Sequence, residues 1–368
     1  MDLTLNLRYY VKQTAIDNAI KETMTREPEL FWYKNNGIVI ICSNYAVDGT
    51  KLKLWDFSII NGGQTTNRIG NLDIEPDKNF YITCKVIQME GIEQAEQDKF
   101  ALKIAESSNA QKPIRKVDLV ANTTEQIRLK QRLKEIGVYY LTKKGEPKPK
   151  KVEKYYITNV DQVGKLSLAV VMQMPASARN NSKKMYNSEY FYSIYGNDAR
   201  CGVIADALRI SAYYEKFRKE DLVAKGFDKD FVIPMITSGR TFQMACISFL
   251  CKIKYGVFTY EEVEKRFNDD SELEKVLKKM GNMEHIISAK YDNEEEIFRE
   301  IFSEIGENVL GECYANAREK EETATITATN YMKNDKNYYR YILKKLWAVY
   351  NRNSKLKNDI AKICGMEN

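Results

Sequence analysis

Runs of β-branched and other apolar residues, separated by short polar turns, recur near the start of the chain and predict three β-strands. The predicted strands are GIVIIC at 37–42, LKLWDFSII at 52–60 and NFYITCKVIQ at 79–88. An amphipathic pattern at 15–24 predicts a short helix before them. Between the second and third strands, the few residues at 64–73 leave room for only a short helix.

Two longer helical patterns follow these strands. Residues 92–108 place Phe100 and Ile104, with Ala101 and Ala105, on one face. Residues 114–137 end at Gly137, a residue type common just after helix C-termini. The resulting order is strand, strand, helix, strand, helix, helix. It predicts a small mixed α/β domain.

The segment at 141–155 contains two prolines, a glycine and six lysines, which predicts a mobile basic loop and a domain boundary. Beyond it the patterns are helical. Residues 163–174 suit a core helix, residues 259–267 open with the capping box Thr259 and Glu262, and residues 328–352 suit a long amphipathic helix.

The predicted fold class is therefore α+β, or α/β, with two domains. A small mixed α/β domain is expected at residues 1–157 and a mainly α-helical domain at residues 158–368.

Composition narrows the class of protein. Hydrophobic residues make up 43% of the 368 residues and charged residues 29%, which is typical of a soluble globular chain. No apolar run approaches the roughly 20 residues of a membrane helix, and no secretory signal opens the sequence. We expect a cytoplasmic protein without a membrane partner.

Cysteine and histidine content limits the chemistry. The seven cysteines form no CxxC pair, so buried free thiols are expected instead of a disulfide framework. His285 is the single histidine, and its neighbours offer no partner for a metal site or a serine triad. Neither zinc nor haem is expected, and any hydrolysis would have to use carboxylates and a metal.

The stretch FSIINGGQTTNRIGNL at 57–72 is the first candidate for chemistry. Asn-Gly favours a hairpin turn, but no alternating strand pattern follows it. A strand, a turn and a helix start fit better, and the unpaired amides of a helix start attract anions. The motif also fits a purely structural turn. The candidate phosphate-binding residues are Asn61, Gly62, Gly63, Gln64, Thr65, Thr66 and Arg68.

The second candidate is AESSNAQKPIRKVD at 105–118, which follows a predicted helix. If this segment lies beside the turn, Glu106 provides a carboxylate for Mg²⁺. Asn109, Lys112 and Arg115 provide polar and cationic groups for a phosphate. An ordinary polar loop between helices is the alternative.

Several motifs between residues 4 and 196 resemble those of the abortive infection phage resistance (AIPR) family. The resemblance implies a role in bacterial defence against phage, and it fits either a short member or one domain of a longer protein. The motifs are LNLRYYVKQTAIDNAIKETM, FWYKNNGIVIIC, FSIINGGQTTNRI, AESSNAQKPIRKVDL, YYLTKKGE and PASARNNSKKMYNSEYFYSIYG.

The order NNGI, IINGGQTTNRI and ESSNAQKPIRKVDL is also similar to the nucleotide-binding domain of ParB chromosome-partition proteins. This likeness implies a ParB-like α/β domain that binds a nucleoside triphosphate with Mg²⁺. Glu106 or Asn109 would lie near the metal. The chain departs from that pattern at Asn61, where ParB proteins have an acidic residue, and at Thr65 and Thr66, where they have arginines. Arg68 would have to compensate, so the resemblance supports binding more than hydrolysis.

Two other functions remain open. A metal-dependent nuclease would use the acidic-x-Lys element of Glu146 and Lys148 with Asp118, although restriction-type folds place such an element on a strand. A non-enzymatic DNA-binding or scaffold module would use the basic loop against the phosphate backbone, and the net charge of +6 is compatible with such a partner. Other defence proteins and a second copy of the chain are further expected partners. The loop lysines are Lys143, Lys144, Lys148, Lys150, Lys151 and Lys154.

Overall fold

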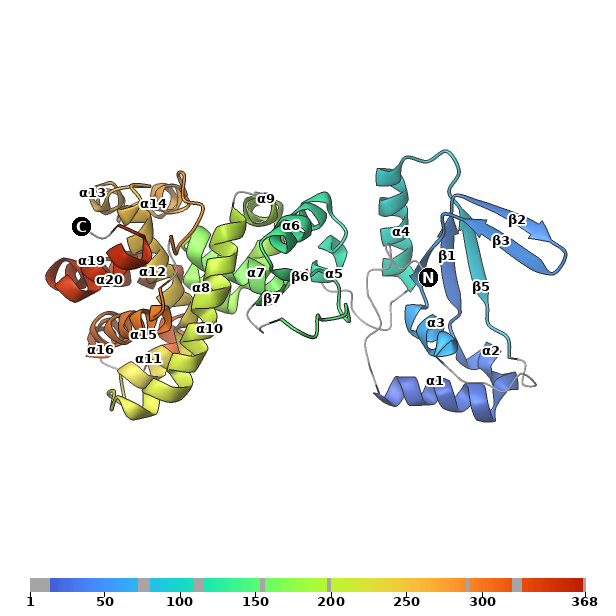
Figure 1. Cartoon of the computed structure of the whole chain (residues 1–368), viewed down its shortest axis with the longest axis horizontal. Coiled ribbons are helices and arrows are strands. Elements are labelled where there is room, and N and C mark those ends of the chain that lie inside the picture. Colours follow the sequence, from blue (N-terminus) through green and yellow to red (C-terminus); the bar gives the residue numbers. More distant parts are fainter. Residues whose placement is uncertain are drawn as a thin grey trace. The chain divides into compact units, whose positions relative to one another are not determined.

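The computed structural model describes residues 14–71, 80–108, 116–152, 156–196, 200–288, 291–319 and 326–366 (Figure 1). The chain forms two compact units. The sheet unit comprises Met1–Ile127 with Leu141–Pro149, and the helical unit comprises Arg128–Tyr140 with Lys150–Asn368. Because the units exchange segments between residues 128 and 150, no single residue divides them. The small mixed α/β part followed by a mainly helical part confirms the predicted fold class. The predicted boundary at residue 157 stays a prediction.

A three-stranded mixed sheet forms the centre of the sheet unit. Its strand order is β4-β1-β5, with β1 antiparallel to β4 and parallel to β5. The strands are β1 (Ile38–Cys42), β4 (Ser58–Asn61) and β5 (Cys84–Gln88). The predicted strand at 37–42 is confirmed. The third predicted strand is shorter than expected, because residues 80–83 are irregular.

A separate two-stranded hairpin corrects the second predicted strand. Residues 52–60 are not one strand. β3 (Lys51–Trp55) ends just before Asp56, whose φ of 46° turns the chain before β4 begins. β3 pairs instead with β2 (Asn44–Asp48), in a register that sets Asp48 opposite Lys51. This register leaves the two-residue turn Gly49–Thr50. The sequence pattern did not predict this hairpin.

Among the described residues of the sheet unit, six helical segments lie wholly within it. They are α1 (Thr14–Arg26), η1 (Pro28–Leu30), α2 (Phe31–Lys34), α3 (Gly63–Gly70), α4 (Gln94–Ser108) and α5 (Lys116–Val120). The helices predicted at 15–24 and 92–108 are confirmed as α1 and α4.

One core cluster joins the sheet to α4. Ala101 of α4 packs with Ile41, Ile60 and Met89, and Ile104 lies against them. The prediction that Phe100 shares this face is wrong, since Phe100 is 41% exposed.

The helix predicted at 114–137 is broken in two. Residues 114–115 lie outside the described residues. α5 ends at Val120, and α6 (Thr124–Glu135) begins after Thr123, whose carbonyl accepts from the Ile127 amide. Asn and Thr have lower helix propensities than most residue types, which favours a break at Asn122 and Thr123. The predicted end is confirmed: Gly137 has a φ of +82°.

The helical unit is built from short and medium helices with one short strand pair. The pair is β6 (Tyr139–Leu141) with β7 (Ile157–Asn159). The helical segments are α7 (Val160–Leu166), η3 (Ser167–Val171), α8 (Pro175–Asn180), η4 (Ser182–Tyr186), α9 (Ser188–Tyr195), α10 (Cys201–Ala224), α11 (Val232–Ser238), α12 (Arg240–Lys254), α13 (Tyr260–Glu264), α14 (Asp270–Leu277), α15 (Glu294–Ile305), η6 (Gly306–Gly311), α16 (Glu312–Glu319), α17 (Ala328–Tyr331), α18 (Asp335–Asn337), η7 (Tyr338–Ile342), α19 (Leu343–Arg352) and α20 (Ser354–Ile363).

Three sequence predictions concern these helices. The core helix predicted at 163–174 is present as α7 and the π-helical turn η3, and both are largely buried. The capping box of Thr259 and Glu262 is confirmed at the start of α13. The long helix predicted at 328–352 is wrong, because the chain breaks after α17 and restarts at α18, where Asn334 is the N-cap.

Helix α12 lies in the core, and its polar side chains satisfy carbonyl groups there. Gln243 donates to the Phe302 carbonyl at 3.1 Å, and Ser248 donates to the Val170 carbonyl at 2.7 Å. Lys252 is 0% exposed, and its Nζ donates to the carbonyls of Val171 at 2.8 Å and Leu277 at 2.7 Å. Burial lowers the pKa of Lys252 well below its usual value.

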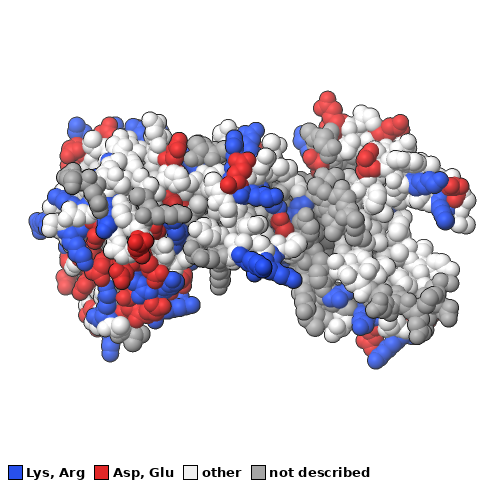
Figure 2. All heavy atoms as spheres, viewed as in Figure 1, with Lys and Arg blue, Asp and Glu red and all other residues white. Residues whose placement is uncertain are grey.

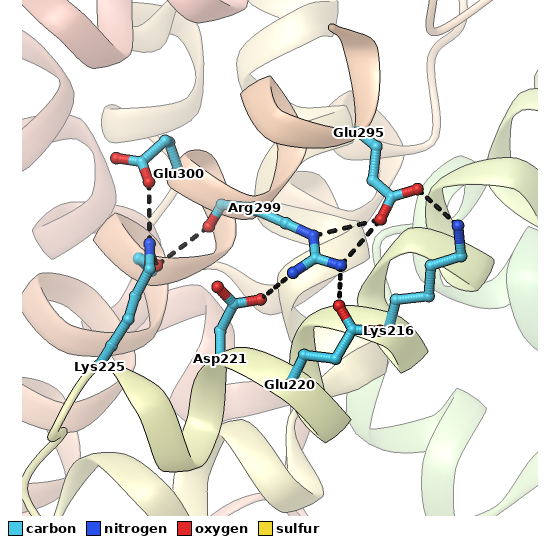
Figure 3. A network of polar contacts seen from close by, with 8 residues as sticks. Lys216, Glu220, Asp221, Lys225, Glu295, Arg299 and Glu300 are labelled. Atoms are coloured by element: carbon cyan, nitrogen blue, oxygen red, sulfur yellow. Dashed lines mark hydrogen bonds and ion pairs between the residues drawn. The ribbon is translucent and has the colours of Figure 1, made fainter.

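An ion-pair network joins α10 to α15 on the outside of the same unit (Figure 3). The Arg299 guanidinium of α15 contacts Asp221 of α10 at 2.7 Å and also pairs with Glu220. Glu295, one turn before Arg299, contacts it at 2.9 Å and Lys216 at 2.6 Å. The network links the outer faces of the two helices through Arg299 and Glu295.

Among the residues that the structure describes, no helix is both long enough and apolar enough to cross a membrane. The seven cysteines are free thiols, as predicted, and Cys84 differs from the other six in being exposed.

Candidate functional site

The stretch at 57–72 forms the strand, turn and helix that its pattern predicts. β4 ends at Asn61, Gly62 adopts a left-handed conformation with φ 89° and ψ 11°, and α3 begins at Gly63. The hairpin alternative is wrong, because the residues after Gly62 are helical.

Two glycines allow the backbone to cross itself at this turn. A Cβ on Gly62 would lie 2.8 Å from the carbonyl oxygen of Gly37 and 3.0 Å from Ile38 Cα. A Cβ on Gly37, where φ is +78°, would lie 2.5 Å from the Thr83 carbonyl oxygen. Both positions therefore require glycine for conformation and for space. The fold alone explains Gly37 and Gly62.

Asn35 connects this crossing to α3. It was not among the site residues predicted from the sequence. Its Oδ1 accepts from the Gly37 amide at 2.9 Å, and its Nδ2 donates to Thr65 Oγ1 at 3.2 Å. The polar turn KNNG was visible in the sequence. Its link to Thr65, 30 residues further on, was not.

Both threonine hydroxyls predicted to contact a ligand take part in local structure. Thr65 is 8% exposed and accepts the bond from Asn35. Thr66 Oγ1 donates to the Gly62 carbonyl at 2.9 Å, so its one proton is directed into its own helix. These hydroxyls stabilise the turn.

The backbone amides at the start of α3 are further donors of the turn. A left-handed residue followed by helical residues brings successive N–H groups into a concave arrangement that suits an anion. Asn61 Oδ1 accepts from the Gly62 amide at 2.8 Å. The N-cap residue Gly62 provides no side-chain cap, and the first turn of α3 has no acidic residue. Gly63, Gln64 and Arg68 are half-buried.

The second predicted cluster lies largely outside the described residues. Glu106 belongs to α4, although its side chain is not among the described ones. Asn109, Lys112 and Arg115 fall within 109–115, which lies outside the described residues. The predicted proximity of this cluster to the turn stays a prediction.

The basic loop has no regular structure between Thr142 and Val152. Lys144, Lys148, Lys150 and Lys151 are exposed, and Lys143 is half-buried. Lys154 lies outside the described residues.

The nuclease candidates are engaged in structure of their own. Glu146 accepts from the amides of Thr142 at 3.0 Å and Lys143 at 3.3 Å, so its carboxylate folds back onto its own loop. Asp118 is only 3% exposed in α5. The acidic-x-Lys element lies in an irregular segment instead of on a strand.

The His285 side chain is 54% exposed and has a partner that its local sequence does not show. Its Nδ1 lies 3.2 Å from Asp206 Oδ2, and that oxygen also accepts from the amides of Ile286 and Ile287. The hydrogen bond to Asp206 raises the pKa of His285. Asp206 thus ties the 285–287 segment to α10, which is a structural role.

No group of three or more His, Cys, Asp or Glu side chains that could hold a metal ion occurs among the described residues. Acidic and basic side chains are intermingled over the visible face of the helical unit (Figure 2). The net charge of +6 therefore does not mark one basic face in this view.

Comparison with known proteins gives one match. No curated protein and no solved structure matches the chain. The AIPR protein family model matches residues 3–304, which include the turn between β4 and α3 and most of the helical unit. Since this match covers well over half of the 368 residues, the chain belongs to the AIPR family, as its motifs predicted.

Proposed function

We propose that this AIPR chain acts in abortive-infection defence against phage, and that its turn between β4 and α3 binds a phosphate group of a nucleotide or a nucleic acid. Family membership supports the defence role. The phosphate site rests on one observation, the left-handed Gly62 that leads into a helix start without a side-chain cap.

The groups of the turn suit a phosphate better than an organic cation or an apolar ligand. The first-turn amides of α3 carry the positive end of the helix dipole, and no carboxylate in that turn opposes an anion. Arg68, one turn further on, adds a positive charge to the same short helix. A phosphate oxygen would take the place that a capping side chain has in other helices.

A nucleoside triphosphate with Mg²⁺ is the ligand that we propose first. For its phosphate part, we propose the first-turn amides of α3 and the Arg68 side chain. For the metal, Glu106 remains the proposed ligand, and Asn109, Lys112 and Arg115 remain the proposed polar contacts. Bound Mg²⁺ would neutralise part of the triphosphate charge. Other defence proteins, or a second copy of the chain, are the proposed partners.

Calorimetric titration of the full chain with ATP and GTP, with and without Mg²⁺, tests the site. Gly63→Val places a branched side chain at the first helical position, and we expect it to weaken binding by at least about tenfold. Gly70→Val is the matched control at the other end of α3, where a Cβ meets nothing within 4 Å. We expect the control to bind as wild type does.

Two more variants separate charge from metal. Arg68→Ala removes one charge-assisted bond, with an expected loss of about ten- to a hundredfold. Glu106→Ala should weaken binding chiefly when Mg²⁺ is present. If wild type binds neither triphosphates nor short DNA, and a bacterial host stays protected from phage by Gly63→Val, the turn is only structural.

A further inference from the structure

A cavity in the helical unit lies where four helices meet, and none of its lining residues belongs to the sheet unit. Its volume is about 410 Å³, and its walls come from α7, α8, α10 and α12 with the last residues of α11. Cavities of about 300–1,000 Å³ are the size range of small-molecule sites.

Positive charge predominates in this cavity. Four cations line it, one from each of α7, α8, α10 and α12, against the single carboxylate of Glu215. Glu215 contacts two of them, Arg218 at 2.9 Å and Arg240 at 3.3 Å, so its charge is shared between them. The two other cations are Lys165 and Arg179.

Lys165 and Arg179 have no carboxylate partner among the residues that the structure describes. Arg179 NH1 donates to Asn180 Oδ1 at 2.9 Å and approaches the Thr329 carbonyl at 3.5 Å, which holds the guanidinium without neutralising it. Burial lowers the pKa of Arg179, which reflects the cost of keeping its charge there. Like charges in one cavity also repel each other. An anion bound between Lys165 and Arg179 would offset this repulsion and the cost of burying the guanidinium charge.

Neutral donors in the same cavity add to the charge. α12 is a 15-residue helix that starts at the cavity, its N-cap is Gly239 without a side-chain cap, and its first turn has no acidic residue. Thr241, in that turn, lines the cavity and is 9% exposed. Its Oγ1 is buried and has no hydrogen-bond partner among the described residues. A buried hydroxyl without a partner is rare in folded proteins unless a ligand or water provides one.

We propose that this cavity is a second anion site, one that binds a small phosphate-bearing molecule through Lys165, Arg179 and the first turn of α12. The site is independent of the proposed function, because the two sets of residues belong to different units. The cations come from different helices, so a bound phosphate would also hold α7, α8 and α12 together.

Calorimetry of the full chain at fixed ionic strength tests this site, with inorganic phosphate, pyrophosphate and ATP as the probes. We expect Lys165→Gln and Arg179→Gln each to lower the affinity for pyrophosphate about tenfold. Thr241→Val keeps the shape of the side chain and removes the hydroxyl, and it should lower the affinity without lowering the melting temperature.

Two controls make the result specific. Lys219→Gln removes an exposed cation of α10 next to Arg218 that does not line the cavity, and it should change the affinity by less than about twofold. Gly63→Val, in the sheet unit, should leave pyrophosphate binding at the cavity unchanged.

Three outcomes would overturn the proposal. One is that wild type binds none of the three probes at millimolar concentration. Another is that Lys165→Gln and Arg179→Gln bind as wild type does, or lose no more affinity than Lys219→Gln. The third is that a 5′-phosphorylated oligonucleotide binds far more tightly than pyrophosphate and competes with it, which would assign the cavity to nucleic acid instead of a small molecule.

Discussion

The two units of this chain differ in how completely each buries its own apolar surface. Most of the large hydrophobic side chains that stay exposed belong to the sheet unit, although it is the smaller one. In the hairpin of β2 and β3, Tyr45, Val47 and Leu52 lie on one face and are 46%, 70% and 44% exposed. The helical unit instead encloses large aromatic residues completely and uses buried polar side chains to satisfy its carbonyl groups.

This difference shows where the stability of each unit comes from. The helical unit depends on buried helices such as α12 and η3 and on the groups that contact them. The sheet unit depends on a three-stranded sheet with a small core cluster and on a glycine crossing at Gly37 and Gly62. A substitution in one unit should therefore affect that unit alone.

The largest effect is expected at Lys252. Lys252→Ala leaves the carbonyls of Val171 and Leu277 without a donor and opens a cavity in the core, so we expect the helical unit to lose about 3–5 kcal/mol of unfolding free energy. Trp347 fluorescence reports on this unit in a chain with Trp32→Phe and Trp55→Phe, since the chain has three tryptophans.

Lys252→Met is the control for that experiment. It keeps most of the volume and removes the donors, so its loss should be smaller, about 1–3 kcal/mol. If the rate of amide hydrogen exchange in Lys252→Ala rises as much in the sheet unit as in the helical unit, the two units do not unfold independently.

A smaller effect is expected at Gly62. Gly62→Ala combines a φ of +89° with a Cβ 2.8 Å from the Gly37 carbonyl oxygen, and we expect a loss of about 1–3 kcal/mol confined to the sheet unit. Hydrogen exchange of peptides that cover β1 and β4 measures this loss. Gly49→Ala is the matched control, because its φ is +61° and a Cβ there meets nothing within 4 Å. A loss at Gly49→Ala as large as that at Gly62→Ala would mean that the crossing itself contributes little.

The smallest effect concerns the pH dependence of the helical unit. Since Asp206 raises the pKa of His285 above its unfolded value of 6.5, the pair stabilises the fold fully below pH 6.5. That contribution is lost as the pH rises through the raised pKa. The His285 side chain is 54% exposed, so solvent screening limits the effect to less than about 1 kcal/mol. Urea unfolding of the wild type and of His285→Gln from pH 6 to pH 9 measures it, and the difference in unfolding free energy between the two should shrink as the pH rises. A difference that stays constant over this range would assign the pH dependence to another group.

Local signals in the sequence predicted the local parts of the fold. The helix start after Gly62, the capping box at Thr259 and the helix end at Gly137 each follow from residues within a few positions of one another. The hairpin of β2 and β3 was also within reach, because a Gly at the first position of a two-residue turn between apolar alternations favours a hairpin, and Gly49 has that position. The turn at Asp56 could not be predicted in this way. Few residues other than glycine adopt a φ of 46°, and an Asp within an apolar run does not by itself indicate that conformation.

Contacts between distant residues could not be predicted in this way. Asn35 and Thr65 are 30 positions apart, and Asp206 and His285 are 79 apart. The cations of the second anion site extend from Lys165 to Arg240 along the chain. A single sequence carries no signal for such pairs. They come together only through the tertiary packing of the chain.

The buried amine of Lys252 links folding to proton release. A neutral amine has two N–H donors, which equals the number of carbonyls that Nζ contacts, so loss of the charge need not leave a carbonyl without a partner. At any pH between the lowered pKa and 10.5, the unfolded chain binds a proton that the folded chain gives up. Refolding in that range therefore releases a proton from Lys252, and through this one group the folded helical unit gains stability as the pH rises towards 10.5.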